Sequence, residues 1–123
     1  MRRVIIESPF AHPTAEGRAA NREYAKRCLA DSLQRGEAPF AGHLLYPQVL
    51  DDDVPVERSL GIEAGLTWGA LADATVVYMD RGHSRGMTLG ITRAKELGRP
   101  VEYRWLDRIG DVSEAALITS LGE

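Results

Sequence analysis

The sequence predicts an α/β fold, in which a mainly parallel sheet is covered by helices on both faces. Short apolar runs alternate along the chain with longer segments of helical periodicity. The clearest of these runs, residues 74–80, is rich in β-branched side chains and leads into the glycine-rich turn at residues 81–87, which opens a helix. The 123 residues, 44% of them hydrophobic, are enough for a single domain, residues 1–123, with its own core.

The first strand and helix are predicted within residues 3–35. Residues 3–7 form a short apolar run that ends at Ser8-Pro-Phe10, where proline cannot continue a central ladder. A loop of small and polar residues is expected to about Ala19, followed by a helix to about Arg35. That helix carries apolar residues at helical spacing, and Gly36 is expected to close it.

The middle of the chain is predicted to hold an edge strand and a second helix. Residues 38–45 are expected to form an irregular strand, and their proline and glycine favour an edge of the sheet or the end of a strand. After a loop over residues 46–54, Pro55 suits the first turn of a helix that runs to about Leu71.

The last third of the chain continues the alternation. After the buried strand, Ser84 is expected to cap a helix that stops at Gly98. Residues 100–104 are then the fourth predicted strand, and residues 113–121 form a last short helix. The resulting order, βαβαβαβα, predicts right-handed crossovers and one parallel sheet.

Parallel strands collect functional groups at their carboxyl ends, so residues remote in sequence are expected to meet in one cleft. Four sets of residues follow predicted strands: Glu7, Ser8 and Phe10; His43 and Tyr46; Asp80 with His83, Ser84 and Arg85; and Arg104 with Trp105.

The glycine-rich turn is the strongest local indication of a ligand site. The free amides at the start of the following helix suit a phosphate or a carboxylate, and Arg85 adds a positive charge. The alternative is an ordinary strand-to-helix turn, in which Gly82 and Gly86 serve backbone geometry alone.

Composition excludes several classes of protein. The net charge of -3 argues against binding of polymeric nucleic acid. The apolar runs are too short to span a membrane or to form a signal-peptide core, so we expect a cytoplasmic protein. Cys28 is the only cysteine and lies in the apolar stripe of the first helix, where a buried hydrophobic role is favoured over a nucleophile.

Motifs in both halves of the chain resemble one enzyme superfamily. They are Ser8-Pro-Phe10, Asn21-Arg-Glu-Tyr-Ala25, Leu33-x-x-Gly36-x-x-Pro39-Phe40-x-x-His43, Ala72-Asp-Ala-Thr-Val-Val77, Ser84-x-Gly86 and Ala94-x-x-Leu97-Gly98-x-Pro100-Val101. In order and spacing they are similar to the nucleoside 2-deoxyribosyltransferase superfamily, and closest to its small, largely uncharacterised phage and bacterial members. The resemblance covers about residues 3–104.

The resemblance implies a Rossmann-like, flavodoxin-type three-layer α/β/α domain with a sheet of four to five strands. It also implies a nucleoside or nucleoside 5′-monophosphate as ligand, no cofactor, and a homodimer or higher homo-oligomer. The helix over residues 55–71 is apolar enough to serve both the core and a partner. In enzymes of this superfamily, a glutamate on the helix after the turn attacks the anomeric carbon of the sugar.

This chain departs from that pattern, because Gly90 stands where the resemblance places the nucleophilic glutamate. The nearest substitutes by predicted position are Asp80 and Glu7, with Glu57 and Glu63 as weaker candidates. Glu7 is equally compatible with a buried structural carboxylate paired with an arginine.

Ten residues are predicted to contact the ligand: Ser8, Phe10, Asn21, His43, Tyr46, His83, Ser84, Arg85, Gly86 and Met87. Structural roles remain open for His43 and for the aromatic pair Phe10 and Tyr46, while His12 is expected in a solvated loop that could act as a lid. No metal site is expected, since the acidic run at residues 51–53 points its carboxylates in different directions.

Two classes of function follow. The first is an N-glycosidic-bond hydrolase or transferase that uses a non-standard catalytic carboxylate. The second is a non-catalytic nucleotide-binding protein that senses or sequesters a nucleotide signal.

Overall fold

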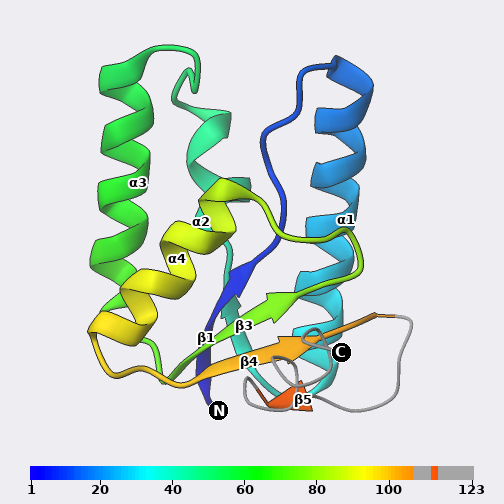
Figure 1. Ribbon diagram of the computed structural model, residues 1–123, viewed down its shortest axis with the longest axis vertical. Helices are drawn as coiled ribbons and strands as arrows, with labels where there is room; N and C mark the ends of the chain where they lie inside the picture. Colours follow the sequence, from blue (N-terminus) through cyan, green and yellow to red (C-terminus); the bar gives the residue numbers. More distant parts are fainter. Residues whose placement is uncertain (107–111, 114–123) are drawn as a thin grey trace, which may run out of the picture.

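A computed structural model of the chain describes residues 1–106 and 112–113 (Figure 1). Its elements follow the order β1 (Arg3–Glu7), α1 (Ala15–Gln34), β2 (Ala38–Phe40), α2 (Gly42–Leu45), the 3-10 helix η1 (Tyr46–Gln48), α3 (Pro55–Gly69), β3 (Ala74–Tyr78), α4 (Arg85–Glu96), β4 (Val101–Arg104) and β5 (Val112–Ser113). None of the described helices is both long and apolar enough to cross a membrane.

The strands form one sheet in the order β2-β1-β3-β4-β5, which is the flavodoxin-like order. β1 pairs in parallel with β2 and β3, and β3 pairs in parallel with β4, while β5 runs antiparallel to β4. Helix α1 covers one face of the sheet, and α4 covers the other with α3 beside it (Figure 1). The prediction of a three-layer α/β/α fold with a mainly parallel sheet is therefore confirmed.

The core divides into two clusters, because successive side chains of β3 point to opposite faces of the sheet. All five residues of β3 are buried. Val76 and Tyr78 pack with Tyr24 and Cys28 of α1 on one face. Val77 packs against α4 on the other face, with Met87, Ile91 and Tyr103. A continuous apolar run was the correct indication of a strand buried on both sides.

The predicted start of α1 is wrong, whereas the end of α3 and the two glycine stops agree with the prediction to within two residues. α1 begins at Ala15, earlier than expected, because the Thr14 hydroxyl caps it by accepting the Gly17 amide at 3.0 Å. α3 ends at Gly69, two residues before Leu71. Gly36 and Gly98 follow α1 and α4 with φ angles of 81° and 70°, as expected of residues that end a helix.

The predicted strand over residues 38–45 is wrong beyond Phe40. Pro39 leaves β2 at the edge of the sheet, as expected, because proline has no amide hydrogen to donate to a second neighbour. The chain then turns into α2 and η1, which carry His43 and Tyr46. The helix predicted over residues 113–121 lies outside the described residues, except for Ser113, which ends β5.

Arg104 belongs to the core, and its expected place in the cleft is a second correction. Its side chain is 1% exposed and donates to Glu37 through Nη1 at 2.6 Å and Nη2 at 2.5 Å. Burial raises the pKa of Glu37, but hydrogen bonds from Arg104, Arg2 and Ser32 outweigh this and lower it to about 2. This ion pair bridges β4 and the start of β2 beneath α1.

Candidate functional site

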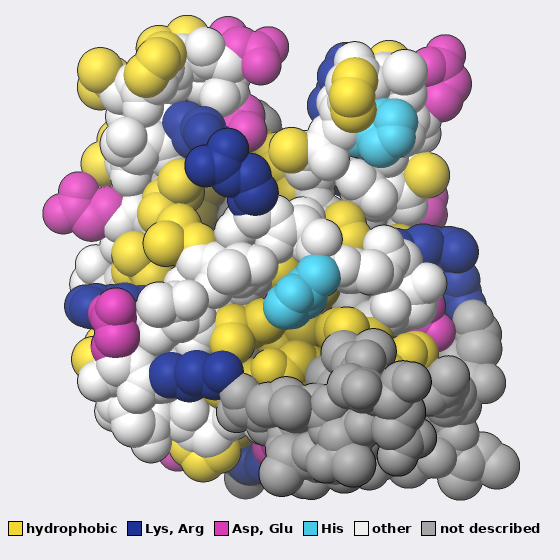
Figure 2. Space-filling view, in the orientation of Figure 1, with side chains coloured by type: hydrophobic (Ala, Val, Ile, Leu, Met, Phe, Trp, Pro, Cys, Tyr) yellow, Lys and Arg dark blue, Asp and Glu magenta, His cyan; other side chains and the backbone are white. Residues whose placement is uncertain are grey.

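A cleft of about 490 Å³ opens beside the carboxyl end of β1, between the inner faces of α3 and α4. Helix α2, η1 and the loop after β1 complete its walls. Figure 2 shows this face hollowed between α3 and the segment leading into α1, with hydrophobic and arginine side chains beside the hollow. The cleft is of the size of small-molecule sites and lies at the carboxyl ends of parallel strands, where α/β folds bind ligands.

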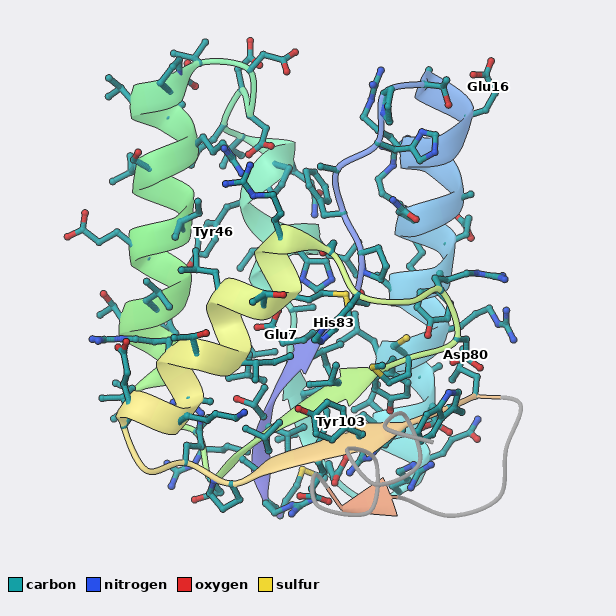
Figure 3. The ribbon with its side chains drawn as sticks, in the orientation of Figure 1. Glu7, Glu16, Tyr46, Asp80, His83 and Tyr103 are labelled. Atoms are coloured by element: carbon teal, nitrogen blue, oxygen red, sulfur yellow. The ribbon has the colours of Figure 1, made fainter. Side chains whose placement is uncertain are left out.

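The carboxyl group of Glu7 lies against the backbone of Gly90 on α4. A Cβ at position 90 would lie 2.5 Å from Cδ of Glu7 and 2.8 Å from its Oε1, closer than atoms approach without overlap. Figure 3 shows Glu7 at the end of β1, beside α4. Only glycine at position 90 leaves room for the Glu7 carboxyl group, which therefore stands where the first side-chain atoms of residue 90 would be.

The pKa of Glu7 is raised to about 8, because burial penalises its charged form. The positive charge of Arg99, which lines the same cleft, lowers the pKa in part. Within the described chain, no side chain donates a hydrogen bond to this carboxyl group. A desolvated carboxyl in a cleft is typical of a functional group, since a structural carboxylate is usually satisfied by donors.

His43 and Ser8 form a hydrogen-bonded pair in the wall of the cleft. The Ser8 Oγ and His43 Nε2 are 2.7 Å apart. Burial lowers the pKa of His43 to about 4, so its imidazole is neutral at physiological pH. The Phe10 ring meets His43 edge-on, with ring centroids 6.5 Å apart. This corner offers an aromatic surface and a neutral hydrogen-bonding ring, which suit a heterocyclic base better than a charged group.

The start of α4 forms the opposite rim. The Ser84 hydroxyl accepts the Met87 amide at 3.2 Å, so it caps the helix as predicted. Gly82 has a φ of 80° and is required by the turn, whereas Gly86 lines the cleft. Arg85 is exposed at the mouth of the cleft. The geometric role is therefore observed for Gly82, whereas a role of Gly86 in ligand binding stays a prediction.

Several predicted site residues do not line the cleft. Asn21 donates from Nδ2 to the Phe10 carbonyl at 3.1 Å and so holds the loop that carries Phe10. His83 is exposed outside the cleft. Asp80 lies toward α1 (Figure 3), where it accepts the Tyr24 hydroxyl at 2.7 Å and the Leu106 amide at 2.9 Å. Of the two candidate catalytic carboxylates, only Glu7 reaches the cleft.

Cys28 and the acidic run at residues 51–53 lie in different surroundings. Cys28 is fully buried, and burial raises the pKa of its thiol to about 12, which leaves no thiolate for nucleophilic chemistry. In the acidic run, the Asp51 carboxylate accepts the Asp53 amide at 2.9 Å. No group of three or more His, Cys, Asp or Glu side chains that could hold a metal ion occurs within residues 1–106 and 112–113.

A family model described as a domain of unknown function (DUF7768) matches residues 2–104, which include every element that lines the cleft. The chain belongs to the DUF7768 family. Its fold is similar to that of a solved 2-deoxyribosyltransferase from the psychrotolerant bacterium Bacillus psychrosaccharolyticus, with a TM-score of 0.60 and 19% sequence identity over 88% of this chain and 77% of that one. No curated protein matches the chain. The expected deoxyribosyltransferase-like fold is therefore confirmed.

One wall of the cleft in this DUF7768 chain was not predicted from the sequence. Gly61, Gly65 and Gly69 recur every fourth residue along α3 and line the cleft, together with Arg58. This spacing was visible in the sequence and indicates a smooth helix face. Arg99 was also missed, because it precedes a strand and only the fold turns it toward Glu7. Glu57 lines the cleft as well, but Glu63 does not.

Proposed function

We propose that the cleft binds a nucleoside or nucleoside 5′-monophosphate, and that Glu7 supplies the carboxylate that cleaves or exchanges its N-glycosidic bond. The observation that carries the proposal is the position of the Glu7 carboxyl group against Gly90. The resemblance assigns the nucleophile to position 90, and in this chain a carboxyl group reaches the same space from β1. The proposed reaction is therefore the one that the resemblance implies, with the carboxylate supplied by β1 and not by α4.

The reaction requires Glu7 in its ionised form. One oxygen of the carboxylate bonds to the anomeric carbon while the bond to the base nitrogen breaks, and the base leaves with that electron pair and takes up a proton. Water or a second base then attacks the anomeric carbon and releases the carboxylate. With a pKa of about 8, roughly a tenth of Glu7 is ionised at pH 7, so turnover should rise with pH to a plateau above about pH 8.

The walls of the cleft fit the two ends of such a ligand. Phe10 and Tyr46 provide aromatic surface for the base, and His43 provides a neutral hydrogen-bonding group. Arg58 and Arg85 lie at the cleft with their charges in solvent, where a 5′-phosphate would meet them. A nucleoside 5′-monophosphate therefore uses more of the cleft than a nucleoside does.

The protonation state of Glu7 also favours a second candidate function. At neutral pH most of the Glu7 population is protonated. A protonated carboxyl group can donate a hydrogen bond to a bound ligand, but it is a poor nucleophile. A non-catalytic protein that senses or sequesters a nucleotide would use the same cleft without attacking the sugar.

Turnover separates the two functions. The protein is incubated with a panel of 2′-deoxynucleosides and their 5′-monophosphates at about pH 7 and about pH 9, and free base is measured by chromatography. We expect base release that is faster at the higher pH and falls at least about 100-fold in Glu7→Gln. Glu63→Gln, outside the cleft on α3, is the matched control and should retain the wild-type rate.

A variant in which the carboxylate is moved from position 7 to position 90 further tests whether Glu7 is the catalytic group. Glu7→Ala removes the group and opens the space above Gly90, so adding Gly90→Glu should restore base release at least about tenfold over the single variant. Ligand-induced thermal stabilisation of the wild type without any base release would instead support the binding function. Neither stabilisation nor base release with any member of the panel would refute both.

We also propose a homo-oligomer in which a second copy of the chain covers the outer face of α3. Gly69 is the one buried residue of this 15-residue helix. Val56, Leu60 and Trp68 are 79%, 55% and 59% exposed, and none of them lines the cleft. Of the three charged residues in α3, Glu57 and Arg58 line the cleft, which leaves Glu63 alone for the outer face. A nearly uncharged apolar face suits a copy of itself across a two-fold axis.

A further inference from the structure

We propose that Arg99 is a positioning residue of the cleft, whose fixed positive charge favours the ionised form of Glu7 that the reaction uses. This inference rests on the proposed function of Glu7. It concerns a residue that neither the sequence motifs nor the family match assigns to the site.

Arg99 is held by two hydrogen bonds from different elements. Its Nη1 donates to the Gly69 carbonyl at the end of α3 at 2.6 Å, and its Nε donates to the Thr75 hydroxyl on β3 at 3.0 Å. Thr75 is fully buried, and Gly69 is the buried residue of α3. The guanidinium is thus fixed between the cleft wall and the sheet, while it lines the same cleft as Glu7.

Both hydrogen-bond acceptors of Arg99 are neutral oxygens, so its charge is not cancelled by them. Within the described residues, Arg99 forms no ion pair, and the carboxyl group of Glu7 forms none either. Thr75, which holds Arg99, pairs with Ile5 in the register of β3 and β1, two residues before Glu7 on the same face of the sheet. The fold thus brings the two groups to the same part of the cleft, where their charges interact. Burial raises the pKa of Glu7 and the charge of Arg99 opposes that rise, so the carboxyl titrates near pH 8 and not higher.

The other charged and titratable groups that face the cleft do not supply this charge. They are His43 and Tyr46 from α2 and η1, Asp52 from the following loop, Glu57 and Arg58 from α3, and Arg85 from α4. His43 is neutral. Arg58 lies 3.8 Å from Asp52, and both Arg58 and Arg85 are exposed, so water screens them. Arg99 is the cation that acts on Glu7.

A direct titration of Glu7 tests the inference without substrate. The side-chain carboxyl ¹³C shift of Glu7 is followed by NMR against pH in the full-length wild type and in Arg99→Gln. We expect the titration midpoint of Glu7 to move from about pH 8 to a higher pH in Arg99→Gln. Each pH unit by which the midpoint rises lowers the ionised fraction of Glu7 at pH 7 about tenfold. Arg99→Lys, which keeps the charge, should stay closer to the wild type than Arg99→Gln.

Two further variants separate charge from fold. Arg93→Gln removes an exposed cation of α4 that does not line the cleft, and should leave the midpoint of Glu7 unchanged. Thr75→Val removes one hydrogen bond that fixes Arg99, and should raise the midpoint even if Arg99→Gln does not fold. A midpoint that is the same in wild type, Arg99→Gln and Thr75→Val would overturn the inference. If the wild type releases no base but the titration midpoint of Glu7 still rises in Arg99→Gln, the proposed function is refuted and the inference about Arg99 stands.

Discussion

The carboxyl group of Glu7 lies so close to the backbone of Gly90 that a Cβ atom at position 90 would overlap it. The two residues lie on different elements, β1 and α4, which pack together on one face of the sheet. Glycine inside a helix costs about 1 kcal/mol relative to alanine. Here that cost makes room for a half-buried carboxyl group with a raised pKa, as the proposed function of Glu7 requires.

Alanine at position 90 should stabilise the fold less than alanine at an unobstructed glycine of a helix. A Cβ at position 90 would overlap the Glu7 carboxyl group, which must move to make room, and this movement offsets part or all of the gain in helix propensity of about 1 kcal/mol. Gly65→Ala is the matched control: a Cβ at Gly65 meets nothing within 4 Å, so this variant should gain up to about 1 kcal/mol. Urea denaturation measures both. Equal stabilisation by the two substitutions would contradict the observed contact.

Glu7 should make the stability of the protein fall as pH rises. Its pKa is raised from 4.5 to about 8 in the folded state, so between these values the folded protein holds a proton that the unfolded chain has released. The stabilising contribution is fully present below pH 4.5 and is lost as pH rises through about 8. Glu7→Gln removes this dependence and should therefore be more stable, relative to wild type, at about pH 9 than at about pH 5.

Urea denaturation of both proteins across that pH range tests the linkage. The exposed variant Glu63→Gln controls for loss of a carboxylate from the surface and should follow the wild-type profile. Parallel profiles for wild type and Glu7→Gln would show that Glu7 is not desolvated in the folded protein.

The sequence was sufficient for the four parallel strands, although β2 is shorter than predicted and β5 was not predicted, and it was sufficient for part of the cleft. Local patterns with a single physical cause gave correct predictions. The apolar run predicted the buried strand β3, Ser84 was predicted as the cap of α4, and Gly36 and Gly98 were predicted as the ends of their helices. The turn into α2 was missed, because the residues after Phe40 satisfy strand and helix patterns equally.

Side-chain direction was beyond the sequence. Asp80 and Glu7 both end strands, but only the folded chain shows that the Tyr24 hydroxyl engages Asp80 while Glu7 faces α4. Likewise, Arg99 precedes β4 and Arg104 is its last residue, yet Arg104 pairs with Glu37 in the core and Arg99 lines the cleft. Such choices depend on contacts between distant segments and leave no local pattern.

Arg85 should distinguish nucleotides from nucleosides. Its side chain is exposed at the mouth of the cleft, where it can meet a 5′-phosphate but not the base. A charge-assisted hydrogen bond to phosphate contributes enough that Arg85→Gln should weaken binding of a nucleoside 5′-monophosphate about tenfold and leave nucleoside affinity unchanged. Isothermal titration calorimetry measures both affinities. Arg93→Gln, an exposed arginine of the same helix outside the cleft, should change neither, and equal losses for both ligands would assign Arg85 a structural role.

The outer face of α3 should hold two copies of the chain together. A charge within an apolar interface is strongly unfavourable, so Leu60→Asp, at the centre of the exposed apolar face, should convert the assembly to a monomer of 13.5 kDa. Size-exclusion chromatography with multi-angle light scattering gives the mass. Leu97→Asp, at an exposed leucine after α4 that is 46% accessible, controls for a new surface charge and should keep the wild-type mass. A wild type that is monomeric at every concentration tested would refute the interface.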